Sequence, residues 1–507
     1  MDAKASSSWM PKGITKSNST ASAGGRSTKS YDSVKVIGGY ALGSLHLVRH
    51  DDSPRHSTDG DEAHGPPPLD PPPPSSQHLQ VRQPPLPRNV MNHGLGGGDI
   101  VIVLHLPEQY TVGYDSVSFS TGKFVGIRDV PAGPHFFWAA HSQGTSPRCG
   151  FWIMSSGLDC VHVVEWHMFS EVFVQPTRAE TRIQAEGVGA IYHKLPPYRD
   201  PSAVSTAPGA LSVSSIEANV QMWEQLVSGV SRKVLDRLTA EQEDGWNVHT
   251  GDRVRGAPRL PAEMELDRTL CRALFQSYEL KFSFEQQSRT YCISSFGRDR
   301  TLDAIDATSC VLSHLADSPS RRLTEDDIVG EVQFAYIVGA YLGNESCIRQ
   351  WWFMLLRIVL RAHRLVRQRP GLVAALIRAL TAQLTHSLRW MEDSVLDWSG
   401  VSTRELRLAL VIYKRRLRES QESTPNASRE QVDVWVAFTR LESAVAELGW
   451  DLDAYYLRRG KVSLEDGDEL ELELDELQAE DERGEWAPQI VELNEHSQVI
   501  GLVSWSD

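Results

Sequence analysis

The hydrophobic pattern of the chain changes its period near residue 263, and this change constrains the fold more than any other feature. From Asp99 to Trp246, β-branched and aromatic residues stand in short runs separated by turn residues, as in β-strands. From Glu263 to Leu457, apolar residues recur three and four positions apart, which indicates amphipathic helices. The sequence therefore predicts an α+β fold class, with a β-rich N-terminal domain followed by an α-helical C-terminal domain.

The first domain opens with the run DIVIVL, which is bounded by Gly98 and Pro107 and predicts a buried strand. A helix over 214–239 is expected to close the domain, because apolar residues follow a Ser-Ser cap at helical spacing. Further strands are predicted at 115–120, 123–130, 135–140, 149–156, 159–169 and 190–195.

The second domain is expected to be a set of antiparallel helices with short connections. KFSF at 281–284 has the composition of a short strand. The predicted helices are 268–280, 301–316, 325–343, 347–368, 372–388, 403–420 and 429–450.

The two ends of the chain have compositions that differ from those of the domains. Residues 1–98 are dominated by Ser, Gly, Pro and His, so they cannot bury enough apolar surface to offset the entropy of ordering. Glu465 to Glu485 holds twelve acidic residues and one arginine, and the apolar segment EWAPQIVELNEHSQVIGLVSW follows it. We expect a disordered N-terminal region, and an acidic tether that carries a docking peptide.

These observations give six predicted regions. They are a disordered region (1–98), a β-rich domain closed by a helix (99–246), a linker (247–263), an α-helical domain (264–460), an acidic tether (461–485) and a docking segment (486–507).

Charge and cysteine content narrow the functional classes. The acidic segment carries −11 of the net charge of −15, so the body is close to neutral and has no strongly basic domain for nucleic acid. The six cysteines are scattered without a CxxC pair, which suits a reducing compartment and predicts no metal centre. The longest apolar stretches are interrupted by charged residues, so a soluble protein is expected.

The stretch FVGIRDVPAGPHFFW, at 124–138, is the strongest candidate for catalysis, because it holds His135 together with the pair Arg128 and Asp129. No nucleophile stands near it in a recognisable arrangement, and neither a GxSxG motif nor a phosphate-binding glycine loop is present. A histidine in an aromatic strand is more often a hydrogen-bonded structural residue. The sequence therefore predicts no catalytic, cofactor-binding or metal-binding residue, and a hydrolase or isomerase using His135 with Asp129 or Asp115 remains the alternative.

Four arginines in the helical domain stand four, three and three residues apart, which predicts that they share one helical face. Such a face is usually solvated, and the alternative is a contact surface for an acidic partner or for the acidic tail. The residues are Arg357, Arg361, Arg364 and Arg367.

The order of residues in the first domain resembles the Aar-two splicing factors, which are assembly chaperones of the U-five small nuclear ribonucleoprotein. The residues that carry the resemblance are Gly113, Tyr114, Asp115, Ser118 and Phe119, then Phe124, Gly126, Ile127, Arg128, Val130, Pro131, Gly133, His135 and Phe136, and finally Arg148, Gly150, Phe151 and Trp152. Ala132, Arg128 and Tyr114 stand where the family usually has proline, lysine and isoleucine. These exchanges are conservative for a turn and for surface charge.

The helical domain continues the resemblance, which covers about Asp99 to Glu419. Its matching residues are Gly330, Glu331, Gln333, Phe334, Ala335, Gln350 and Trp351, together with LTAQL at 380–384.

The resemblance implies a non-enzymatic protein of the nucleus and cytoplasm that takes part in mRNA splicing. Family members bind the RNase H-like region of the Prp-eight scaffold and hold off the helicase Brr-two until the particle is assembled. The end of the chain is similar to a family tail that adds a strand to the partner, and QIVEL alternates as strand addition requires. Partner-binding residues are therefore predicted at Arg357, Arg361 and Arg364, and at Gln489, Ile490, Val491, Glu492 and Leu493. Other U-five proteins are expected as partners, and a membrane, a cofactor or direct nucleic-acid binding is not. A protein-interaction scaffold unrelated to this family is the remaining alternative.

Overall fold

The structure is a computed structural model. It describes residues 90–91, 97–108, 110–120, 123–141, 147–199, 213–239, 245–258, 265, 279–286, 305–316, 323–391, 394–423, 427–453, 459–463, 469–473, 490–493 and 499–502. The prediction of disorder for 1–98 lies outside the described residues, apart from a short strand at Val90–Met91 and two glycines.

Two sheets form a sandwich in the first domain. The first sheet has the order β1-β8-β2-β5, with β9 paired to β8, and contains one parallel pair, β2 with β8. The second has the order β10-β7-β6-β3-β4 and is antiparallel. The strands are β1 (Val90–Met91), β2 (Asp99–Leu104), β3 (Tyr110–Tyr114), β4 (Val117–Ser120), β5 (Gly126–Val130), β6 (Gly133–His141), β7 (Cys149–Ser155), β8 (Cys160–His167), β9 (Val172–Val174) and β10 (Trp246–His249).

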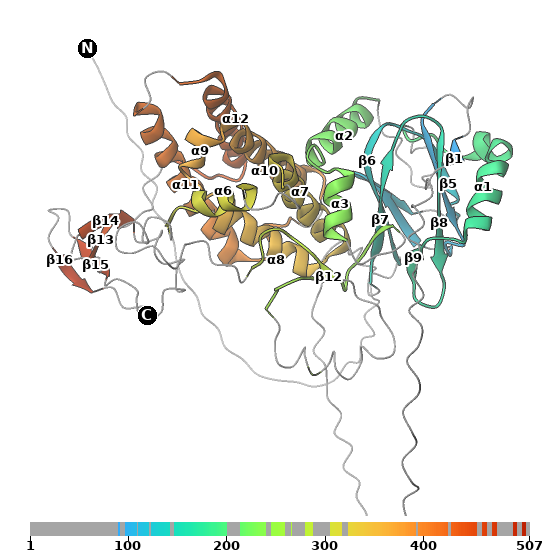
Figure 1. The fold of residues 1–507 in the computed structure, drawn as a ribbon, viewed down its shortest axis with the longest axis horizontal. Coiled ribbons are helices and arrows are strands. Elements are labelled where there is room, and N and C mark those ends of the chain that lie inside the picture. The colour runs from blue at the N-terminus through green and yellow to red at the C-terminus, as the bar shows by residue number, and fades with distance from the viewer. Residues whose placement is uncertain are drawn as a thin grey trace, which may run out of the picture. The chain divides into compact units, whose positions relative to one another are not determined.

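Each sheet buries both of its faces. Val101, Ile127, Phe137 and Phe151 belong to the core that lies between the two sheets. Alternate residues of β2 and β8 point the other way and pack against α1 (Arg178–Ile191), which Figure 1 shows lying along that sheet. Side chains on the outer face of the second sheet join the core of the helical domain. A sheet covered on both sides explains why the strands read as continuous apolar runs.

The structure corrects several predictions for this domain. The strand predicted at 190–195 is wrong, because that segment is the end of α1 followed by a 3₁₀ turn at Tyr192–Lys194. The closing helix is two helices, α2 (Val213–Leu226) and α3 (Arg232–Leu238), and Ser231 caps the second one. The domain also continues past residue 246, since β10 pairs with β7 as far as His249.

The helical domain follows the parallel pair β11 (Arg253–Val254) and β12 (Glu279–Leu280). The end of the helix predicted at 268–280 is therefore a strand, and its other residues lie outside the described part of the chain. The helices are α6 (Thr308–Ala316), α7 (Glu325–Leu342), α8 (Glu345–Phe353), α9 (Leu365–Gln368), α10 (Pro370–Arg389), α11 (Gly400–Glu422) and α12 (Arg429–Ala446). α7 is buried on nearly all sides, which fits the apolar run FAYIVGAYL at 334–342.

The helix predicted at 347–368 is interrupted. α8 continues into a π-helix at Met354–Val359, the chain turns at 360–364, and α9 then forms a single short turn. No proline or glycine stands at the break, so it carries none of the usual sequence signals of a helix kink.

The last described segment is a four-stranded antiparallel sheet of order β14-β13-β15-β16. Its strands are β13 (Arg459–Ser463), β14 (Glu469–Glu473), β15 (Ile490–Leu493) and β16 (Val499–Leu502). Two of these strands lie in or next to the segment for which an acidic tether was predicted.

No helix within the described ranges is both long enough and apolar enough to cross a membrane.

Candidate functional site

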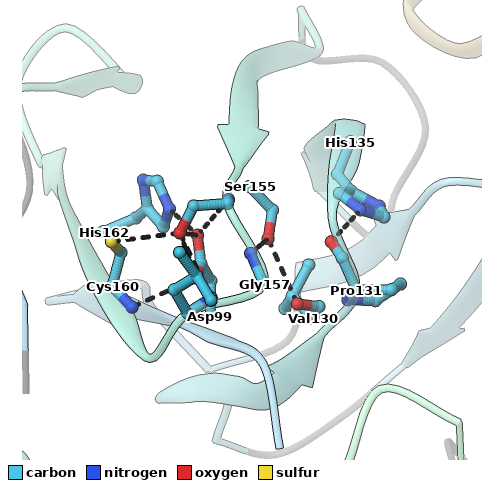
Figure 2. Close-up of polar contacts among 10 residues, drawn as sticks. Asp99, Val130, Pro131, His135, Ser155, Gly157, Cys160 and His162 are labelled. Atoms are coloured by element: carbon cyan, nitrogen blue, oxygen red, sulfur yellow. Dashed lines mark hydrogen bonds and ion pairs between the residues drawn. The ribbon is translucent and has the colours of Figure 1, made fainter. Parts of the chain in front are cut away.

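His135 lies on β6 and is 3 % exposed, and both of its ring nitrogens are engaged. Nδ1 lies 2.7 Å from a carboxylate oxygen of Asp115, and Nε2 lies 2.9 Å from the carbonyl oxygen of Pro131. Figure 2 shows the ring directed at that carbonyl. Because both partners accept hydrogen bonds, both ring nitrogens donate, and the imidazole is a cation paired with a buried carboxylate.

The pKa of His135 is consistent with this charge. Burial alone would lower it, but the Asp115 carboxylate and the Pro131 carbonyl outweigh burial and raise it above its usual value. Asp115 also accepts hydrogen bonds from the Phe136 amide at 2.9 Å and from the Tyr198 hydroxyl at 2.5 Å. Burial and the same carboxylate raise the pKa of Tyr198. Asp115 itself has a left-handed backbone, φ 52°, which suits a tight turn between β3 and β4.

Asp115, and not Asp129, is the carboxylate bonded to His135. Asp129 instead accepts hydrogen bonds from the Tyr192 hydroxyl and from the Arg128 guanidinium. Arg128 donates from Nε to the Leu195 carbonyl at 2.9 Å, so it fastens the segment after α1 to β5. The interpretation of His135 as a hydrogen-bonded structural residue therefore agrees with the structure.

A second buried carboxylate, Asp99, was not singled out from the sequence. It stands at the start of β2 and is fully buried. Figure 2 shows it beside the turn between β7 and β8, where it accepts hydrogen bonds from the Ser156, Leu158 and Cys160 amides at 2.7 to 3.1 Å and from His162 at 2.9 Å. Burial would raise its pKa, but these hydrogen bonds and the His162 charge lower it well below its usual range. The Gly-Asp pair before the apolar run was the only sequence signal.

These groups are arranged to hold the fold and are poorly placed for acid–base chemistry. A general base needs a nitrogen that can reach a substrate proton, and both nitrogens of His135 are occupied inside the domain. The geometry therefore argues against the hydrolase or isomerase alternative. Within the described ranges, no group of three His, Cys, Asp or Glu side chains could hold a metal ion.

The helical motif GEVQF lies where α7 meets the turn between α2 and α3. Gly330 approaches Gly229 so closely that a Cβ at Gly330 would lie 2.3 Å from the Gly229 carbonyl oxygen. The Gln333 side chain accepts a hydrogen bond from the Gly229 amide at 2.7 Å and donates to the Gln225 carbonyl at 3.0 Å. The motif residues are thus required by close packing between the two domains.

The contact of α7 with the β-rich domain and its helices α2 and α3, called the joint from here on, also contains an ion pair, hydrogen bonds and a ring contact. Glu331 is fully buried, and it accepts hydrogen bonds from Arg237 at 2.6 Å and from the Ser283 hydroxyl at 2.7 Å. Burial raises the pKa of Glu331 even though Arg237 opposes the shift. Phe334 stacks on Trp152 of β7 with ring centroids 5.8 Å apart. At the far end of α7, Arg148 donates to the Tyr341 carbonyl at 3.0 Å.

The four arginines do not share one helical face, and this prediction is wrong because the helix breaks between them. Arg357 and Arg361 line a pocket of about 70 Å³ together with Glu405 of α11. Arg364 is paired with Asp306 through its Nε at 3.2 Å. Arg367 donates to the Ser420 and Ser423 hydroxyls at the end of α11. Partner binding by Arg357, Arg361 and Arg364 stays a prediction.

Four of the five residues predicted to dock form β15, Ile490–Leu493, while Gln489 lies outside the described residues. β15 pairs with β13 on one side and with β16 on the other. The segment is therefore a strand, as its alternation predicted, and its main chain is already paired within the chain.

Comparison with known families finds two matches. A model of the AAR2 N-terminal domain matches residues 97–240, and a model of the AAR2 C-terminal repeat region matches residues 282–453. They cover the β-rich and the helical domain in the same order. No curated protein matches the chain significantly.

Proposed function

The chain belongs to the AAR2 family of splicing factors, and from this premise we propose that it is a non-enzymatic assembly chaperone of the U-five small nuclear ribonucleoprotein. In this proposal it binds the RNase H-like region of the Prp-eight scaffold and delays binding of the helicase Brr-two. Family membership removes the alternative of an unrelated scaffold.

The observation that carries the proposal is the role of the family motifs in this chain. His135 and Asp115 hold a turn, while Gly330, Glu331 and Gln333 hold the two domains together. Residues used in this way stabilise the folded body and supply no reactive group, which supports a protein that acts through its surfaces.

The sheet β14-β13-β15-β16 limits how the docking segment, 486–507, can bind a partner. Strand addition needs free main-chain groups, and those of β15 are paired with β13 and β16. Docking through β15 therefore requires it to leave one neighbour, whereas β14 and β16 are edge strands that can pair directly.

The test is a titration of the full chain with the purified RNase H-like domain of the scaffold, followed by calorimetry. We expect a one-to-one complex, and competition with Brr-two for the scaffold. Absence of a complex with the full chain and with residues 99–507 would contradict the proposal.

A tail variant separates docking from folding. Deletion of 486–507 should weaken the complex while leaving the melting curve of the body unchanged. A variant that binds as tightly as the full chain would remove the tail from the interface and leave the body to account for binding.

We propose that the protein acts in both the cytoplasm and the nucleus, because particle maturation would span the two compartments. A fluorescent fusion found in only one of them under all conditions would contradict this. Direct RNA binding is not part of the proposal, and a gel-shift assay with U-five RNA should show no complex.

A further inference from the structure

The turn between β8 and β9 presents two large apolar side chains to solvent. Phe169 is 96 % exposed and Met168 is 67 % exposed. Most large apolar residues of a folded domain are at least partly covered, and two neighbours this exposed at one tip form an unusual feature.

Hydrogen bonds within the turn restrict the backbone of this tip. The Glu171 amide donates to the His167 carbonyl at 2.9 Å, and the Ser170 hydroxyl lies 2.6 Å from His167 Nδ1. Glu171 has a left-handed backbone, φ 52°, which is costly for a residue other than glycine and lets the chain re-enter the sheet as β9. Because the turn is ordered before binding, a partner that takes up these side chains does not have to order the backbone that carries them, so the tip is suited to act as an anchor.

The charge around the tip indicates what kind of surface it fits. Glu171 is exposed within the turn, and Glu165 is partly exposed near the end of β8. The pairing of Leu104 with Glu165 brings the end of β2 beside that end of β8, and Glu108 is exposed just beyond it. The segments 104–108 and 165–175 contain no lysine or arginine. An acidic border repels an anionic membrane and attracts basic side chains.

We propose that Met168 and Phe169 anchor the protein partner, inserting into an apolar pocket that is bordered by lysine or arginine side chains. The inference rests on the proposed function, because the partner is the scaffold domain to which the chain binds. It adds a contact on the β-rich domain that is separate from the arginines and from the tail.

The experiment is calorimetric titration of full-length variants with the RNase H-like domain. Phe169→Ala should weaken Kd about 30-fold and Met168→Ala several-fold, as for central anchor residues. Glu171→Gln should weaken binding slightly and reduce its dependence on salt. Leu158→Ala is the matched control, since Leu158 is 60 % exposed in the turn at the opposite end of β8 and should leave Kd unchanged.

The outcomes separate this inference from the proposed function. If the unmodified chain fails to bind the domain, both are overturned. If it binds and Phe169→Ala binds equally well, only the anchor is overturned. Phe169→Ala could also keep scaffold binding and lose self-association, which would assign the tip to a contact with a second copy. It could instead lose binding to vesicles that contain phosphatidylserine, which would assign the tip to a membrane. Either result would overturn the anchor. All variants should keep the melting temperature, because the side chains are exposed.

Discussion

The two domains each bury one histidine whose ring nitrogens are both engaged, yet the two rings carry different charges. His135 of the β-rich domain faces the Asp115 carboxylate, which raises its pKa despite burial. His386 of the helical domain lies 2.9 Å from the Tyr336 hydroxyl and 3.0 Å from the Tyr341 hydroxyl, and burial lowers its pKa to about 4. The partner thus decides whether a buried histidine is a cation or neutral, and neither ring is available to a substrate.

The largest change in stability is expected when Asp115, the charge partner of His135, is replaced. Asp115→Asn leaves the His135 cation buried without its counter-charge and should cost about 3–5 kcal/mol in the unfolding free energy of the β-rich domain. Asn tolerates the left-handed backbone at this position, so the effect reports the charge and not strain. Urea unfolding followed by tryptophan fluorescence measures it.

The control for this variant is an exposed pair of the same type. His105 and Glu165 lie 3.3 Å apart with side chains 65 % and 34 % exposed. Glu165→Gln should change stability by less than about 1 kcal/mol. An Asp115→Asn variant as stable as this control would mean that His135 is not charged in the folded protein.

The sequence supplied some parts of this arrangement and not others. Runs such as DIVIVL and the apolar helix at 325–343 were predictable, because their composition leaves one way to bury them. α1 was missed because its sequence, RAETRIQAEGVGAI, has two glycines and buries only Ala185 and Val188. The Thr-Arg-Ala-Glu start at 177–180, where Thr177 caps the helix, was a sequence signal for it that went unused.

The candidate site was predictable only in part for a similar reason. His135 and Asp115 stand 20 residues apart, and pairing of β6 with β3 brings them together. The sequence offered Asp115 and Asp129 equally, and the register of the strands decided between them. The break after Val359 follows a π-helix and has no proline or glycine beside it, so the apolar spacing of 347–368 predicted an unbroken helix there.

The next largest effect concerns acid conditions and the neutral histidine. Unfolded histidine has a pKa near 6.5, and that of folded His386 is about 4, so the unfolded chain binds more protons between these values. Stability should fall by up to about 3 kcal/mol from pH 6.5 to pH 4. His386→Gln should remove this part of the slope, and the exposed His193→Gln should not. Equal slopes for the two variants would contradict the assignment of a neutral ring.

A third substitution tests whether the joint makes the two domains unfold in one transition. Gly330→Ala forces a Cβ against the Gly229 carbonyl and should cost about 1–3 kcal/mol at the joint. Gly371→Ala is the matched control, because a Cβ there meets nothing within 4 Å and alanine favours a helix by up to about 1 kcal/mol. Calorimetry should show one broadened or split transition for Gly330→Ala only. A single sharp transition at the original temperature would mean that the joint is softer than its geometry indicates.

The smallest effect lies on the alkaline side, where the charged histidine should lose its contribution. The folded pKa of His135 is above its unfolded value, so the stability it provides is complete below pH 6.5 and decreases as the pH rises through the folded pKa. The loss is about 1.4 kcal/mol for each unit by which the pKa is raised. Asp115→Asn should flatten this slope while leaving the acid slope of His386 intact. If both slopes change together, the two histidines are coupled through the joint, and the charge of one ring depends on the packing of the other domain.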